Sequence, residues 1–134
     1  MSGKGYLLDR IGGDAALEAA VNAFYKRVIA DQALAKFFDG TDVEKLKKHQ
    51  FKFMKLAFTK IPESVDVAKI LTDKHSKLFD MGLNATHFDL VAGHLVDALQ
   101  SLSVPQNLID EAVGIVGPLR AVFEAGAEAA AAKA

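Results

Sequence analysis

Four histidines are the residues of this chain best suited to metal chemistry, because the neutral imidazole is the commonest metal-binding side chain. They are His49, His75, His87 and His94. His75 follows Leu71 by four residues and precedes Leu78 by three, which places it in an apolar stripe of a predicted helix. A single histidine in such a stripe is more often a core residue than a ligand, so this pattern leaves both interpretations open.

His49 strengthens the case for a ligand, because it lies on the inward face of a different predicted helix. It follows Leu46 by three residues and precedes Phe53 by four. Two histidines on separate helices can face one flat metal centre from opposite sides. Neither has the H-x-x-x-H or H-E-x-x-H partner that a local zinc site requires. Their apolar neighbours suit a large ring, so the pattern favours an iron porphyrin.

Two polar side chains near these histidines are candidates to contact a small ligand. Gln50 follows His49 directly, and Tyr25 lies at the edge of an apolar stripe, four residues after Val21. A buried tyrosine hydroxyl needs a hydrogen-bond partner. We expect Tyr25 and Gln50 either to hydrogen-bond a ligand at an open iron position or to bond each other within the core.

The other histidines and the lysines are interpreted as surface groups. His87 lies three residues after Asn84, in the first turn of a predicted helix, and His94 lies beside polar positions. The lysines between Lys45 and Lys55 are typical of a solvated helix face. If a porphyrin lies beneath that face, one of these lysines is positioned to meet a propionate.

Helices must position all of these groups, because alanine, leucine and lysine dominate the chain and only three prolines interrupt it. Gly12 and Gly13 separate a short N-terminal segment from a first long helix, for which Asp14 is the predicted N-cap. Apolar stripes predict further helices over residues 41–58, 67–82, 84–102 and 105–123. The fold class is therefore all-α.

Local signals place the ends of these helices. Thr41 and Glu44 have the spacing of a capping box, Asn84 is a predicted N-cap, and Pro105 opens the last helix. The segment from Thr59 to Ser64 ends the second helix, because its proline removes a backbone donor. The alanine-rich tail, residues 125–134, either frays or extends the last helix.

Length, charge and composition exclude several classes of function. The 134 residues suit a single domain over 1–134, with its core at about 6–124. A net charge of −1 gives no reason to expect a nucleic-acid partner. No apolar stretch has the length of a membrane span, and the N-terminus is too short and charged for a signal peptide, so we expect a cytoplasmic location. Without cysteine there is no disulfide and no thiolate ligand.

At these residues the chain resembles the group I truncated hemoglobins, the short two-over-two helical globins of bacteria, algae and protists. The resemblance runs from about Leu8 to Phe123. The resemblance rests on the order and spacing of eight short segments, which are residues 10–13, 20–28, 37–39, 49–53, 75–78, 82–84, 87–89 and 104–105. It implies an all-α truncated globin, a two-over-two helical sandwich around heme.

The resemblance also implies a role for individual residues. His75 corresponds to the proximal heme ligand, and the Tyr25 hydroxyl is directed at bound ligand together with Gln50. His49 corresponds to a distal position on the helix that crosses above the iron. The residues implied as cofactor-binding are Phe24, Phe38, Leu46, Phe53, Met54, Leu71, Leu78, Phe88, Val91 and Leu95.

The residue type at position 49 indicates whether the protein can supply a sixth iron ligand. Some family members carry histidine or lysine there and use it in that role. We therefore expect bis-histidyl coordination by His75 and His49 when no gas is bound. An external ligand must then displace His49, which lowers its apparent affinity. In the competing interpretation His49 only hydrogen-bonds and leaves the iron open.

The chain departs from the family pattern at three places. A glycine pair that often follows the distal helix is replaced by Thr59 and Lys60, and Leu46 stands where some relatives carry glutamine. Some relatives attach heme through a histidine on the last helix, but residues 117–121 contain none. We therefore expect non-covalent heme b, with Tyr25 and Gln50 as the main polar distal groups.

The resemblance implies a monomeric heme protein that binds O₂, NO and CO. With an unidentified reductase it suggests nitric oxide dioxygenation, in which NO and O₂ yield nitrate. Bis-histidyl electron transfer and gas sensing are alternatives, and a cofactor-free helical interaction module is the non-enzymatic one. A heme absorption band separates the last of these from the rest.

Overall fold

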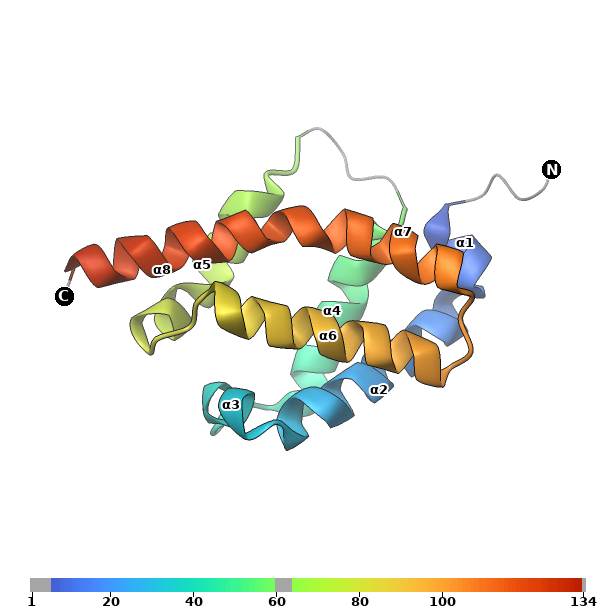
Figure 1. The fold of residues 1–134 in the computed structure, drawn as a ribbon, viewed down its shortest axis with the longest axis horizontal. Helices are drawn as coiled ribbons and strands as arrows, with labels where there is room; N and C mark the ends of the chain where they lie inside the picture. Colours follow the sequence, from blue (N-terminus) through green and yellow to red (C-terminus); the bar gives the residue numbers. More distant parts are fainter. Residues whose placement is uncertain (1–5, 60–63, 134) are drawn as a thin grey trace.

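The computed structural model describes residues 6–59 and 64–133, and these contain helices and no β-strand (Figure 1). The all-α prediction is therefore confirmed. The elements are α1 Leu7–Ile11, α2 Gly13–Ala30, α3 Gln32–Ala35, the 3₁₀ turn η1 Lys36–Phe38, α4 Val43–Ala57, α5 Val67–Asp80, α6 Ala85–Ser101, α7 Gln106–Val116, the 3₁₀ turn η2 Gly117–Leu119, and α8 Arg120–Lys133. No helix of the described residues is long and apolar enough to cross a membrane.

The predicted glycine break between the first two helices is confirmed, but its cap is different. Gly12 has a φ of 124°, a conformation that L side chains rarely adopt, and serves as the N-cap of α2. The chain thus enters the helix at Gly13, and Asp14 lies inside the first turn. The prediction of Asp14 as N-cap is wrong, although its carboxylate still lies where the positive end of the helix dipole favours it.

Aspartate also replaces the expected threonine at the start of α4. Asp42 is the N-cap, and its side chain accepts a hydrogen bond from the Lys45 N–H at 3.2 Å. The Thr41–Glu44 capping box is therefore wrong by one residue. Asn84 is confirmed as the cap of α6. The predicted end of the second helix falls partly on residues 60–63, which lie outside the described part of the chain.

The last predicted helix is divided in two. Pro105 caps α7 as expected, but the chain tightens into η2 at Gly117 and Pro118 before α8 begins. Proline lacks the N–H that would continue the ladder of α7. The alanine-rich tail extends α8 to Lys133, so the second of the two alternatives for this segment is the observed one.

The helices pack as two pairs. In one pair α2 packs on α4, and in the other α6 packs on α7 and α8, while α2 also contacts α6 and α5 contacts α8. In Figure 1, α6 and the α7–α8 arm run along the long axis, with α4 and α5 behind them. This is the predicted two-over-two sandwich.

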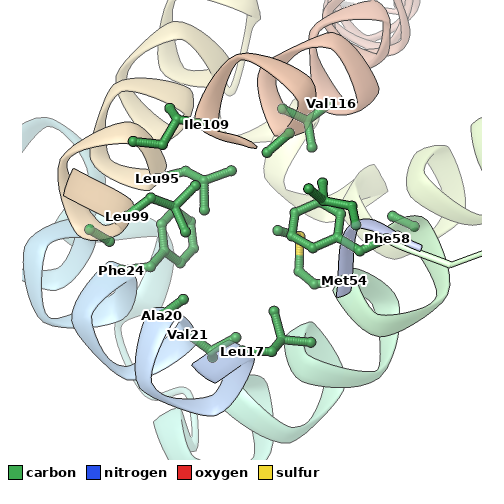
Figure 2. Close-up of a cluster of buried hydrophobic side chains, with 14 of the residues drawn as sticks. Leu17, Ala20, Val21, Phe24, Met54, Phe58, Leu95, Leu99, Ile109 and Val116 are labelled. Carbon is green, nitrogen blue, oxygen red and sulfur yellow. The ribbon is translucent and has the colours of Figure 1, made fainter. Parts of the chain in front are cut away.

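Buried side chains form two separate apolar clusters. The larger joins α1, α2, α4, α6 and α7, and Figure 2 labels side chains that α2, α4, α6 and α7 contribute to it. The smaller contains Phe37, Phe79 and Leu83, with Phe123 and Ala130 of α8 packed against it. The division matters for function, because a cavity is lined by members of both clusters.

Candidate functional site

A cavity of about 510 Å³ lies between the two apolar clusters. This volume is within the roughly 300–1,000 Å³ range of small-molecule and cofactor sites. The structure brings together there all the site residues predicted from the sequence. They are Phe24, Tyr25, Phe38, Leu46, His49, Gln50, Phe53, Met54, Leu71, His75, Leu78, Phe88, Val91 and Leu95.

His75 lies on α5 and is held in one orientation by its own helix. Its Nδ1 is 2.7 Å from the carbonyl oxygen of Leu71, one turn earlier. A carbonyl oxygen only accepts, so Nδ1 must carry the proton and donate it. Burial lowers the pKa of His75, and the hydrogen bond to Leu71 partly offsets this. The imidazole is therefore neutral, with the lone pair of Nε2 free to bind a metal.

Two aromatic rings pack against the His75 imidazole and restrict its orientation. The Phe123 ring of α8 lies at 5.2 Å between centroids in an edge-to-face arrangement, and the Phe79 ring of α5 lies at 6.3 Å. Phe123 also contacts Phe79 at 5.8 Å and Phe88 at 5.0 Å. The orientation of His75 thus depends on both α5 and α8.

Tyr25 supplies a hydroxyl to the cavity from α2. The residue is 6% exposed, and its ring is gripped edge-to-face by Phe24 at 5.1 Å and Phe38 at 6.2 Å. Burial raises the pKa of Tyr25 to about 12, so the hydroxyl keeps its proton at neutral pH. Within the described residues the hydroxyl has no hydrogen-bond partner, and no fully buried side-chain oxygen is left unsatisfied. It must therefore face open space.

His49 and Gln50 face the same cavity from α4. Gln50 is half-buried and His49 is exposed, so the expectation of an inward-facing His49 holds only in that it lines the cavity. Neither side chain forms a hydrogen bond with another described residue. The alternative of a core hydrogen bond between Tyr25 and Gln50 is thus not observed. Tyr25, His49 and Gln50 thus line the cavity without hydrogen-bond partners among the described residues.

The remaining histidines lie mainly where the sequence placed them. His87 is in the first turn of α6 and completes a capping box, accepting at Nδ1 from the Asn84 N–H at 3.1 Å. It also lines the cavity and contacts the Phe37 ring edge-to-face, which its position in the sequence did not reveal. His94 is outside the cavity and pairs with Asp31 at 2.8 Å.

Two cationic residues of the cavity were not predicted. Lys74 and Lys77 of α5 line it, whereas the run from Lys45 to Lys55 on α4 contributes no lysine to its wall. The expectation that an α4 lysine meets a propionate is therefore not supported. Both residues flank His75 on α5, at one position before and two after. The two lysines are three residues apart and so neighbour each other on α5, but their spacing from His75 does not place them on its face, and periodicity gave no signal for them.

Comparison with known proteins shows which family has this fold and this cavity. The sequence model of the family described as bacterial-like globin matches residues 6–124. Group 1 truncated hemoglobin GlbN of Mycolicibacterium paratuberculosis is 40% identical over 113 residues, which cover 84% of this chain and 79% of the relative. The corresponding protein of Synechocystis is 35% identical over 112 residues, which cover 83% and 89%.

Solved structures agree with the sequence matches. Chlamydomonas reinhardtii THB4 superposes with a TM-score of 0.77 and 40% identity, covering 88% of this chain and 94% of that one. The 2/2 hemoglobin of Synechococcus sp. PCC 7002, in the cyanomet state with covalently attached heme, gives a TM-score of 0.77 and 38% identity, covering 89% and 98%.

The helical sandwich with a histidine-bearing apolar cavity is that of a bacterial-like globin, and the chain belongs to this family. Within the family, its relatives of 35–40% identity place it among the group 1 truncated hemoglobins. The sequence-based resemblance is thereby confirmed.

The residues of the cavity fit the heme that this family binds. The walls are predominantly aliphatic and aromatic, as a porphyrin requires. His75 offers a neutral imidazole whose other nitrogen is already satisfied by the Leu71 carbonyl. Lys74 and Lys77 offer positive charge suited to two propionates. The hydroxyl of Tyr25 is a donor without an acceptor among the described residues.

Proposed function

We propose that this chain holds heme b non-covalently through His75 and uses Tyr25 and Gln50 to bind diatomic gases in the same cavity. One observation carries the proposal. A neutral histidine oriented by Leu71 shares an apolar cavity with a tyrosine hydroxyl that has no partner in the described part of the chain. When bound, the heme iron supplies a reversible binding site for O₂, NO and CO. The surrounding side chains hold the heme and hydrogen-bond the bound gas.

Tyr25 and Gln50 act in this proposal as the polar distal groups. The Tyr25 hydroxyl keeps its proton to about pH 12, so it donates a hydrogen bond to a ligand rather than accepting one. Edge-to-face contacts with Phe24 and Phe38 hold its ring, so little rotamer freedom is lost on binding. The Gln50 amide lines the cavity, has no hydrogen bond to a described residue and adds a second donor.

Within this proposal His49 is the sixth iron ligand when no gas is present. It lies on α4, while His75 lies on α5, and both line one cavity. No hydrogen bond to a described residue holds the His49 side chain, so it can move onto the iron and leave again. The ferric wild-type protein should give a low-spin absorption spectrum that becomes high-spin in His49→Ala. A high-spin wild-type spectrum would show that His49 leaves the iron open.

Non-covalent attachment is the proposal for this chain, in contrast to the Synechococcus protein. The last histidine in the sequence is His94, on α6, and its side chain pairs with Asp31 outside the cavity. Neither α7 nor α8 contains a histidine. Acidified butanone should therefore extract the heme completely. Heme retained with the protein after extraction would contradict non-covalent binding.

The proposed reaction is nitric oxide dioxygenation supported by a reductase. The hydrogen bond from Tyr25 would hold O₂ in place until NO enters, and the apolar walls would exclude water. Near-stoichiometric nitrate from the O₂-loaded protein mixed with NO is the expected result. Negligible nitrate, together with rapid reduction and reoxidation of the wild type, would instead favour bis-histidyl electron transfer.

Monomeric state and cytoplasmic location remain predictions of the sequence.

A further inference from the structure

Gly126 is a buried glycine of α8 that lies against an aromatic ring of α5. A Cβ atom added at this position would lie 2.7 Å from Cδ2 of Phe79 and closer still to Cε2 and Cζ. These separations are well below van der Waals contact. Even one methyl group at residue 126 would therefore require the ring, or the helix that carries it, to move.

The Phe79 ring is buried among other side chains. It is 6% exposed and packs in the smaller apolar cluster with Phe37 and Leu83. The Phe123 ring lies 5.8 Å from it and the His75 ring 6.3 Å from it, between ring centroids. Phe79 also follows His75 by one turn of α5, so a displacement of the ring or of the helix reaches the imidazole directly.

We propose that Gly126 is a positioning residue, which sets the orientation of the His75 imidazole through Phe79. The proposal rests on the proposed role of His75 as heme ligand. It assigns a function to the alanine-rich tail, since Gly126 and Ala130 lie beyond the matched residues 6–124. This tail packs on the side of α5 that bears Phe79, and the absent side chain at 126 defines how closely α8 approaches.

The test is the substitution Gly126→Ala in the full-length holoprotein. Alanine favours a helix more than glycine does, so the variant does not weaken α8 itself. In the ferric cyanide complex, the hyperfine-shifted heme methyl resonances report the orientation of the axial imidazole. We expect these resonances to shift and hemin transfer to apomyoglobin to accelerate about tenfold, the scale of one misfitted core methyl group. Unchanged methyl resonances would overturn the proposal.

Two further variants separate positioning from general stability. Gly114→Ala on α7 adds the same methyl group where no atom lies within 4 Å, so it should change neither the resonances nor the hemin transfer rate. Phe79→Leu replaces the ring with a smaller side chain that leaves room for the added methyl group, so Gly126→Ala should change neither quantity further in the Phe79→Leu background. A double variant that differs from Phe79→Leu as much as Gly126→Ala differs from the wild type would contradict transmission through Phe79.

If Gly126→Ala fails to fold, Phe79→Leu alone carries the test, because loss of the ring must also alter the methyl resonances. Unchanged resonances in that variant would overturn the proposal as well. The proposed function is tested separately, by the heme absorption spectra of the wild-type protein and of a variant without His75. Absence of a heme band in the wild type, or a heme spectrum unaffected by loss of His75, would refute the role of His75 before any variant at 126 is examined.

Discussion

Tyr25 illustrates, at the scale of one residue, how a side chain can be placed for a ligand rather than for stability. Its ring is buried and held by two phenylalanines, while its hydroxyl has no partner among the described residues. Desolvating a hydroxyl without giving it a hydrogen bond costs free energy. Because the hydroxyl faces the cavity, a ligand bound there can accept from it.

Removal of that hydroxyl should therefore separate binding from stability. In Tyr25→Phe we expect O₂ to dissociate about tenfold faster, because one hydrogen bond of about 1.4 kcal/mol is lost. Urea unfolding of the apoprotein should show equal or greater stability, by up to about 1 kcal/mol, because an unpaired hydroxyl is gone. Stopped-flow ligand exchange and equilibrium unfolding measure the two effects. A slower or unchanged O₂ dissociation rate would argue against Tyr25 as the donor.

The Asp31–His94 pair gives a second prediction for single residues. Asp31 accepts from the Ala33 N–H through one oxygen and pairs with His94 through the other. The hydrogen bond from His94, followed by that from Ala33, lowers the pKa of Asp31 from its ordinary value of 3.8. Any stability from this carboxylate is thus present above pH 3.8 and lost as the pH falls through the lowered pKa.

Carbon-13 NMR of the Asp31 carboxyl group measures this directly. Its titration midpoint should lie below 3.8 in the wild type and rise in His94→Ala, while staying below 3.8 because the Ala33 hydrogen bond persists. An identical midpoint in both proteins would show that His94 does not act on Asp31.

At the scale of the elements, α6 depends on its first turn. The Asn84 side chain accepts from the Thr86 N–H at 2.9 Å, and the Asn84 N–H donates to His87 at 3.1 Å. This capping box satisfies groups that a helix N-terminus leaves unpaired. Since α6 packs on α2 and α8, its start also positions the Phe88 side of the cavity.

Loss of the cap should be measurable without touching the heme pocket walls. We expect Asn84→Ala to reduce the free energy of unfolding by about 1 kcal/mol in denaturant titration. Asp97→Ala is a matched control on the same helix, because Asp97 is exposed and has no hydrogen bond or ion pair with a described residue. Its effect should stay within about 0.5 kcal/mol. Equal losses in the two variants would count against the capping role of Asn84.

The helices were more predictable from the sequence than their ends and contacts. Apolar periodicity located α2, α4, α5 and α6, because a 3.6-residue repeat is a property of the chain itself. Caps were less predictable, since Asp14 and Thr41 have cap-forming side chains but neighbouring residues took the position. The break at Pro118 did have a local signal, because a proline without an N–H interrupts the ladder of α7, but the apolar periodicity across it hid the break.

Among the residues of the site, those that lie on apolar stripes could be predicted from the sequence. Those that reach the cavity only because of how the helices pack could not. His75 and Tyr25 follow from periodicity together with the family resemblance. Lys74, His87 and Phe123 reach the cavity through the way α5, α6 and α8 pack. Gly126 carries no sequence signal at all, because its significance is the ring of Phe79 that occupies the space of a side chain.

At the scale of the whole molecule, the two apolar clusters meet across a cavity rather than in one continuous core. A small chain with such a cavity lacks the contacts that a filled interior would supply. A ligand that fills it stabilises the native state by mass action.

Heme removal should accordingly lower the thermal stability of the whole protein. With free heme at a thousand times its dissociation constant, the stabilisation is about 4 kcal/mol. Calorimetry of the extracted protein should show a lower melting temperature, which stoichiometric hemin restores. Equal melting temperatures of the apoprotein and the reconstituted protein would mean that the cavity is not where heme binds.

The most direct test of the account is the heme absorption spectrum of His75→Gly, recorded with and without imidazole. If His75 is the ligand that holds the iron, the variant should lose the wild-type spectrum, and added imidazole should restore it by entering the space that the side chain leaves. A wild-type spectrum in His75→Gly without imidazole would contradict the central claim, because the iron would then be held by another residue.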